Sequence, residues 1–205
     1  MEDVLDLYAG LWDDRRPVVC FDERPCQLIE EVRQPLPGGP GQPVRFDYEY
    51  KRNGTCNLFL MVQPLAGWRH VETTERRTSQ DFAHQMKALV DQHFPHAEVI
   101  RVVMDNLNTH TPAALYETFT PDEARRITRR LEFHYTPKHG SWLNMAEIEL
   151  AVLSGQCLKR RIGDMERLRR EVSAWQVERN RQRAKINWQF NISDARVKLH
   201  HLYKS

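Results

Sequence analysis

Residues 97–110 have the sequence AEVIRVVMDNLNTH, an apolar run that ends on Asp105 and passes into a polar turn. The run is rich in β-branched residues and only Arg101 interrupts it, which predicts a strand buried on both faces of a sheet. Asp105 would then stand at the carboxyl end of the strand, where open α/β sheets bind ligands. Taken alone, the stretch favours a simpler explanation, an Asx turn that ends the strand.

The same pattern occurs near the start of the chain. Residues 17–23 have the sequence PVVCFDE, again a short apolar run that ends on an acidic residue, Asp22. Two strands that end in Asp, together with a Glu from a later helix, are suited to holding a pair of divalent metal ions, because hard cations prefer carboxylate oxygens. The sequence therefore predicts a two-metal phosphoryl-transfer site with a third acid further along.

Composition and charge narrow the class of protein. The chain has 205 residues, of which 40% are hydrophobic and 9% aromatic, so it can bury a core and is not disordered. The net charge of +2 does not by itself indicate a nucleic-acid partner. Basic residues cluster from Arg125 onward, whereas acidic residues lead in 1–31. Such clusters suggest a polyanion partner, although solvated helix faces explain any single cluster comparably well.

Cysteine spacing and hydropathy exclude two further classes. The four cysteines form no CxxC pair, which argues against a structural zinc site or a disulfide scaffold. No apolar stretch approaches the length of a membrane span, and no signal sequence opens the chain. We expect a cytoplasmic protein without a membrane partner.

The order of predicted elements indicates a mixed sheet flanked by helices. Strands are expected at 17–22 with 27–32 as a neighbour, at 55–63 and 68–73, at the Asp105 stretch, and at 131–135. A loop rich in Pro and Gly covers 34–43, and Asn53-Gly54 signals a hairpin. Helices are expected at 78–93, as two short segments within 112–130 that include a capping box at Thr120, and at 144–161, 165–181 and 193–203.

The third acid lies where a polar loop enters a helix. Residues 136–149 have the sequence TPKHGSWLNMAEIE and contain two candidates, Glu147 and Glu149. Helical periodicity does not choose between them. With Asn144 as N-cap, Glu147 would also fit a capping box that has no chemical role.

Three motifs together carry a resemblance. FDE at 21–23, VVMDNLNTH at 102–110 and the 136–149 segment resemble the catalytic core of mariner-type DDE transposases, and the nearest branch is the bacterial insertion sequence 630 family. The stretch from Leu143 to Glu147 matches the third motif of that family and selects Glu147. The likeness continues to residues 194–199 and covers nearly all of 17–203.

The resemblance implies an architecture. It implies an α/β, RNase H-like fold with a mixed five-stranded sheet flanked by helices. Residues 1–16 would be a linker remnant, 17–162 the DDE catalytic core, and 163–205 a C-terminal helical extension of the same domain. The interval from Asp105 to Glu147 is longer than is usual in the superfamily, and a short helix at 120–130 would accommodate it. Transposases of this kind carry N-terminal helix-turn-helix domains, and we expect site-specific recognition to be missing from this chain.

The resemblance also implies a chemistry. Asp22, Asp105 and Glu147 would be the catalytic residues and would hold two Mg²⁺ ions, with Mn²⁺ able to substitute. The activity would be DNA strand cleavage and strand transfer, with transposon ends and target DNA as partners and a homodimer as the assembly. Two alternatives remain open: another RNase H-like DNA nuclease, which cleaves without joining, or an inactive DNA-binding remnant that inhibits intact transposase.

Several further residues are candidate DNA contacts. The polar residues beside the acids are expected to contact phosphate: Asn106, Asn108, His110, Lys138 and His139. For the two histidines a simple turn hydrogen bond is equally compatible. Arg160, Arg161 and the arginines of 167–170 are candidate backbone contacts. Trp142 suits either base stacking or packing, whereas Trp175 and Trp188 are assigned to the core.

Overall fold

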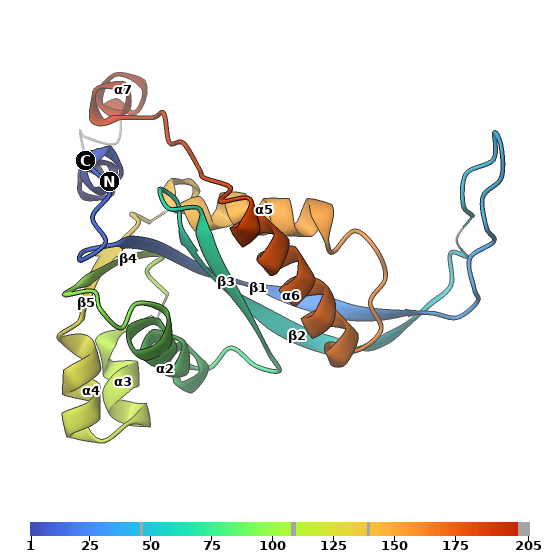
Figure 1. The fold of residues 1–205 in the computed structure, drawn as a ribbon, viewed down its shortest axis with the longest axis horizontal. Helices are drawn as coiled ribbons and strands as arrows, with labels where there is room; N and C mark the ends of the chain where they lie inside the picture. Colours follow the sequence, from blue (N-terminus) through green and yellow to red (C-terminus); the bar gives the residue numbers. More distant parts are fainter. Residues whose placement is uncertain (46, 108–109, 139, 201–205) are drawn as a thin grey trace.

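The chain is built around one mixed sheet (Figure 1). The computed structural model describes residues 1–45, 47–107, 110–138 and 140–200. The strand order is β3-β2-β1-β4-β5, with β1 antiparallel to β2, β2 antiparallel to β3, and β1, β4 and β5 parallel. The predicted α/β, RNase H-like architecture with five strands is therefore confirmed. The strands are β1 (Val18–Glu31), β2 (Tyr50–Gln63), β3 (Trp68–Thr74), β4 (Ile100–Met104) and β5 (Leu131–Tyr135).

Helices cover both faces of the sheet and bury two separate clusters of side chains (Figure 1). Because alternate residues of a strand point to opposite faces, Val19 and Phe21 of β1 enter one cluster and Cys20 enters the other. The first cluster packs beneath α2 (Ser79–Ala88), the π-helical turn η1 (Leu89–His93), α3 (Pro112–Thr118) and α4 (Pro121–Thr128). The second packs beneath α1 (Glu2–Ala9), α5 (Met145–Gln156), α6 (Met165–Arg181) and α7 (Ile192–Lys198).

Side-chain caps define the starts of three predicted helices. The Thr78 hydroxyl and the Asp81 carboxylate form a capping box at α2, and Asp164 accepts a hydrogen bond from the Arg167 backbone N–H at α6. Asn144 accepts one from the Ala146 backbone N–H at α5. The predicted capping box at Thr120 is wrong, since its side chain makes no cap hydrogen bond, although Thr120 is the N-cap and Pro121 is the first residue of the helix.

The structure differs from the expectation of a linker at residues 1–16. Residues 2–9 form α1, and its Val4 and Leu5 are fully buried in the second cluster. The Tyr8 hydroxyl donates to the Leu143 carbonyl oxygen at 2.8 Å, which joins α1 to the segment before α5. Residues 2–9 are thus part of the packed fold. The division into a core at 17–162 and an extension at 163–205 stays a prediction.

One long strand replaces the two expected at 17–32. β1 runs without a turn from Val18 to Glu31, with a register shift against β2 between Gln27 and Ile29. The Asn53-Gly54 pair lies inside β2 opposite that irregularity, so the predicted hairpin there is wrong. Gly54 has a φ of +107°, a conformation that glycine adopts without strain.

The last helices are shorter than expected. α5 ends at Gln156, not near residue 161, and the chain turns there before Asp164 caps α6. α7 ends at Lys198, before the end of the helix expected at 193–203. The last three residues of that expected helix, 201–203, lie outside the described residues. No helix within the described ranges has the length and hydropathy needed to cross a membrane.

Candidate active site

The two predicted aspartates lie at the same level of neighbouring parallel strands. Asp105 directly follows β4, as predicted, but the predicted strand end at Asp22 is wrong, because β1 continues past it, paired with β2, to Glu31. β1 and β4 pair in parallel with Cys20 opposite Val103, and Asp22 and Asp105 each follow two residues later. Since the chain leaves β4 at Met104, Asp105 marks the carboxyl edge of the sheet. The structure therefore brings together the two acids that the repeated sequence pattern singled out.

Glu147 is held near this edge by the start of α5. The Asn144 side-chain amide donates to the Phe21 carbonyl oxygen at 2.8 Å, so the N-cap of α5 is fastened to the residue before Asp22. Glu147 is the third residue of α5, within its first turn, and its side chain is exposed. Its side chain makes no reciprocal cap hydrogen bond, unlike the Asp residues of the capping boxes at α2 and α7.

Glu149 has a different environment on the same helix. Its side chain is fully buried, and Arg69 Nε of β3 lies 2.9 Å from its Oε1. Arg179 of α6 donates to both of its carboxylate oxygens, at 3.1 and 3.0 Å. Glu149 is thus paired with two arginines in the interior, whereas Glu147 is exposed.

The electrostatics of Asp22 reflect a local excess of negative charge. The pKa of Asp22 is raised from 3.8 to about 7, chiefly by burial. A hydrogen bond from the Glu23 backbone N–H opposes this rise, and the charges of Glu23, Asp105 and Glu147 contribute to it. Since the charges of Asp105 and Glu147 both affect the pKa of Asp22, the three acids lie close enough to interact electrostatically. A cation bound here would relieve both the desolvation and the repulsion.

His110 joins two acidic side chains beneath this edge. Its Nδ1 lies 2.7 Å from Asp105 Oδ1, and its Nε2 lies 2.9 Å from Glu23 Oε2. Burial lowers the pKa of His110, but the hydrogen bonds and charges of Asp105 and Glu23 outweigh it and raise the pKa to about 9. With 1% of its side chain exposed and both ring nitrogens beside carboxylates, His110 offers no free donor to a phosphate, which argues against its expected role as a phosphate contact. Glu23, a participant that the sequence reasoning passed over, lies directly after Asp22.

The three acids offer carboxylate oxygens, the type of ligand that hard divalent cations prefer. One oxygen of Asp105 is already oriented by His110. As placed, no three His, Cys, Asp or Glu side chains within the described residues converge closely enough to hold a metal ion. The excess of negative charge around Asp22 would nevertheless favour a bound cation.

The predicted DNA contacts fall into two groups. Asn106 and Lys138 are exposed on the loops that follow β4 and β5, at the same edge as the acids. Asn108 and His139 lie outside the described residues. Arg160 and Arg161 are far from this edge, because Arg161 pairs with Glu31 at 2.5 Å, nine residues along β1 from Asp22, or roughly 30 Å.

The arginines of the second group already have acidic partners. Arg160 Nη2 lies 2.5 Å from Glu171, Arg167 lies 4.0 Å from the same carboxylate, and Arg170 lies 3.8 Å from Glu166. These ion pairs and the distance from the acids both argue against Arg160 and Arg161 as phosphate contacts beside the three acids.

The tryptophans divide between core and surface. Trp175 is 9% exposed within the second cluster, and Trp188 packs partly buried against that cluster, as expected. Trp142 is 43% exposed, and its ring stacks on Trp188 with centroids 6.4 Å apart and planes 16° apart. Packing and surface exposure therefore coexist at Trp142, just before α5.

Comparisons with known proteins agree with this geometry. Comparison with curated proteins gives no match. Solved structures of the Mos1 mariner transposase are similar. The Mos1 paired-end complex with Mn has a TM-score of 0.57 at 17% identity, over 89% of this chain and 55% of that one. The Mos1 strand transfer complex has a TM-score of 0.58 at 15% identity, over 92% and 59%. The chain thus spans less than two thirds of the Mos1 chains that it matches.

A family model gives the assignment. The model described as DDE superfamily endonuclease matches residues 17–169, the segment that carries Asp22, Asp105 and the glutamate at the start of α5. This span includes every strand of the sheet and all of α5. The chain belongs to the DDE superfamily endonucleases.

Proposed function

We propose that this chain is the catalytic core of a mariner-type transposase, nearest to the bacterial insertion sequence 630 branch, that cleaves DNA strands and transfers them to target DNA. The observation that carries the proposal is the shared environment of Asp22, Asp105 and Glu147, in which the latter two charges raise the pKa of the first. The similarity to Mos1 paired-end and strand transfer complexes supports transposon ends and target DNA as the partners.

Asp22, Asp105 and Glu147 are the residues proposed to hold two Mg²⁺ ions, with Mn²⁺ able to substitute. Bound divalent cations would activate water or a DNA 3′-hydroxyl and stabilise the leaving oxygen at phosphorus. That the similar Mos1 structures include complexes with Mn and with Mg supports the choice of metal.

The chain's own residues have distinct tasks in this proposal. His110 holds one oxygen of Asp105, which leaves the other oxygen of that carboxylate for a ligand. Asn144 keeps the first turn of α5 against β1, so that Glu147 faces the strand ends. Lys138 and Asn106, exposed at the same edge, would bind the phosphates on either side of the reacting one.

A homodimer is proposed as the active assembly. The support is that the similar Mos1 structures are paired-end complexes, in which two transposon ends are held together. Sedimentation of the chain with and without transposon-end DNA measures this directly, and a 1:1 complex at all concentrations would argue against it.

The test of the activity uses the purified chain with supercoiled plasmid and with a pre-cut DNA end, in Mg²⁺ or Mn²⁺. We expect metal-dependent nicking and joining that Asp22→Asn, Asp105→Asn and Glu147→Gln each abolish. Ser173→Ala, an exposed change on α6, is the matched control and should keep the wild-type rate. Nicking without joining would make the protein a nuclease of the same fold. DNA binding without nicking, in either metal, would contradict the proposed chemistry for this chain.

A further inference from the structure

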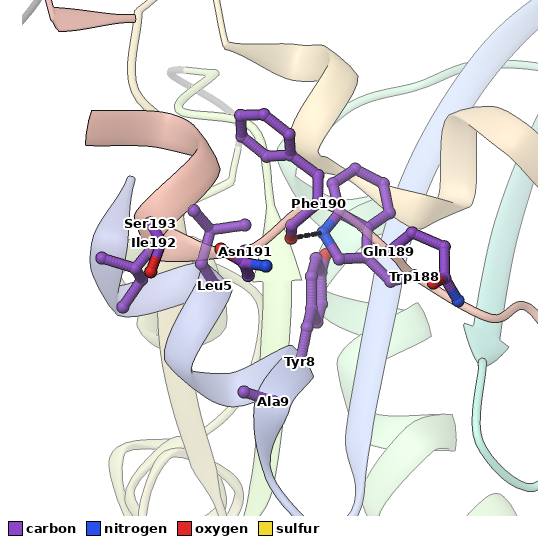
Figure 2. A pocket seen from close by; sticks show the side chains of 9 residues that line it. All are labelled: Leu5, Tyr8, Ala9, Trp188, Gln189, Phe190, Asn191, Ile192 and Ser193. Atoms are coloured by element: carbon purple, nitrogen blue, oxygen red, sulfur yellow. Dashed lines mark hydrogen bonds between the residues drawn. The ribbon is translucent and has the colours of Figure 1, made fainter. Parts of the chain in front are cut away.

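A pocket of about 300 Å³ lies between α1 and the extended segment that precedes α7 (Figure 2). Its lining includes Leu5, Tyr8 and Ala9 from α1, and Trp188, Gln189 and Phe190 from the segment. It is separate from the metal-binding carboxylates, and no role has been assigned to it above. Its walls combine ring faces with amide and hydroxyl groups.

The ring faces form a continuous aromatic surface. Tyr8 and Trp188 have centroids 5.4 Å apart, and Trp142 contacts Trp188 in a stacked arrangement and Phe190 edge-on at 5.3 Å. The Trp188 indole N–H donates to the Phe190 carbonyl oxygen at 2.6 Å, the bond drawn in Figure 2, which fixes the orientation of the indole. Rigid aromatic faces are the feature on which unstacked nucleobases bind irrespective of sequence.

The polar groups of the pocket retain hydrogen-bonding capacity. Gln189 is exposed, and its side-chain amide makes no hydrogen bond within the described part of the chain. Asn191 uses its Oδ1 to cap α7, which leaves its NH₂ group, and Ser193 adds an exposed hydroxyl. An amide offers a donor and an acceptor side by side, which is the pattern that a base edge requires.

The pocket lies next to the carboxylates. The Tyr8 hydroxyl, which borders the pocket, lies 3.4 Å from Cys20 Sγ and donates to the Leu143 carbonyl oxygen. Cys20 comes two residues before Asp22, and Leu143 comes four residues before Glu147. Tyr8 thus connects the wall of the pocket to the two chain segments that lead to Asp22 and Glu147.

We propose that this pocket holds one unpaired nucleobase of the DNA strand that passes the carboxylates. The proposal rests on the proposed function, because it takes DNA as the substrate. Stacking on the ring faces supplies affinity, and Gln189 and Asn191 contact the base edge. A nucleobase matches the lining in both respects, because it has flat faces for the rings and a polar edge for the amides.

The experiment measures binding of a fluorescently labelled duplex with one unpaired terminal nucleotide, and of the same duplex with an abasic sugar there, to the full chain in EDTA. We expect the base to strengthen binding roughly 5- to 150-fold. Ala9→Trp, which fills the pocket from an exposed helix end, should abolish this difference. Ala174→Trp, an exposed alanine of α6, is the matched control and should preserve it. Gln189→Ala should leave abasic binding unchanged and reduce the preference among the four bases.

Equal affinity of the wild-type chain for the two duplexes, or an undiminished difference in Ala9→Trp, would overturn the proposal. Thermal unfolding of each variant checks that the chain is folded. Metal-dependent plasmid nicking, measured on the same preparations, separates the two hypotheses. Nicking without base discrimination would reject the nucleobase pocket and leave the proposed function standing. Base discrimination without nicking would support the pocket and count against the proposed cleavage chemistry.

Discussion

The side-chain amide of Asn144 donates to the carbonyl oxygen of Phe21 across 2.8 Å, while its oxygen caps α5 through the Ala146 backbone N–H. One buried side chain therefore links the residue before Asp22 to the helix that carries Glu147. The geometry of the three carboxylates depends on this link as much as on the carboxylates themselves.

Asn144→Ala is expected to destabilise the protein by about 2–4 kcal/mol, because the change removes a helix cap and leaves the buried Phe21 carbonyl without its donor. Nicking should fall further than the loss of folded protein explains. Urea denaturation measures the first effect and plasmid nicking the second. Asp164→Ala, which removes the cap of α6 at a distance, is the control: a loss of about 1 kcal/mol with normal nicking is expected.

Substitutions of the two glutamates of α5, Glu147 and Glu149, should have opposite effects: one should lower activity and the other stability. Glu149→Gln leaves Arg69 and Arg179 without their counter-charge, and Arg69 is fully buried, so we expect a loss of about 3–5 kcal/mol. Glu147→Gln changes an exposed residue, and unfolding should shift by less than about 0.5 kcal/mol while nicking is lost. Urea denaturation of both variants measures the contrast, and equal destabilisation would contradict it.

Asp22→Asn should stabilise the metal-free protein at alkaline pH. The folded-state pKa of Asp22 is raised to about 7, so its proton stabilises the fold fully below pH 3.8, and that contribution is lost as pH rises towards 7. The asparagine carries no such penalty. In EDTA at pH 8 the melting temperature of the variant should exceed that of the wild type by roughly 3–8 °C, with the gap closing towards pH 4.

Adding Mn²⁺ to the same samples provides the internal comparison. A saturating ion should raise the melting temperature of the wild type and leave that of Asp22→Asn nearly unchanged, because only the first retains the full ligand set. A variant that is less stable than the wild type in EDTA at pH 8 would disprove the repulsion on which the expectation rests.

His110→Ala is expected to weaken metal binding and to lower stability by about 3 kcal/mol. The change leaves the buried Glu23 without the imidazole and frees Asp105 from its orienting contact. The Mn²⁺ concentration for half-maximal nicking should rise about 10- to 100-fold. An effect on stability alone, with an unchanged metal requirement, would mean that His110 only supports the fold.

Lys138 and Arg160 should differ in the salt dependence of DNA binding. Lys138→Ala is expected to lower the slope of log affinity against log salt by about 0.9, the value for one lost phosphate contact. Arg160→Ala should leave the slope unchanged, because its guanidinium is paired with Glu171 far from the carboxylates. Fluorescence anisotropy between about 50 and 200 mM salt resolves a change of this size.

Much of the fold was predictable because the strands and helices carry strong local signals. The β-branched run before Asp105, the caps at Thr78 and Asp164, and the proline at the start of α4 all lie where the structure begins or ends an element. Asn53-Gly54 misled because the same dipeptide also suits an irregular stretch within a strand, where the pairing of β1 and β2 decides its conformation.

The site was predictable only in part from local pattern. The apolar runs before Asp22 and Asp105 led to both aspartates, although only Asp105 follows a strand end. Glu147 and Glu149 differ in their surroundings through Arg69 and Arg179, which lie on other elements. Likewise, the role of His110 depends on Glu23, a residue far away in the chain. Contacts of this kind have no signature in sequence spacing, and a family resemblance was needed to choose the glutamate.

The buried ion pairs among Arg69, Glu149 and Arg179 have a consequence for protein engineering. An apolar trio of similar volume would often be as stable or more so, but it would tolerate rotation of α5 about its axis. The charged trio permits only one rotational position of α5 about its axis. Shifting the helix by one residue, a rotation of about 100°, would bury a carboxylate or guanidinium without its counter-ion. Redesign of this interior for thermal tolerance would therefore risk turning the neighbouring acid out of alignment, and insertions between residues 144 and 149 should be more damaging than equal insertions in the loop before β2.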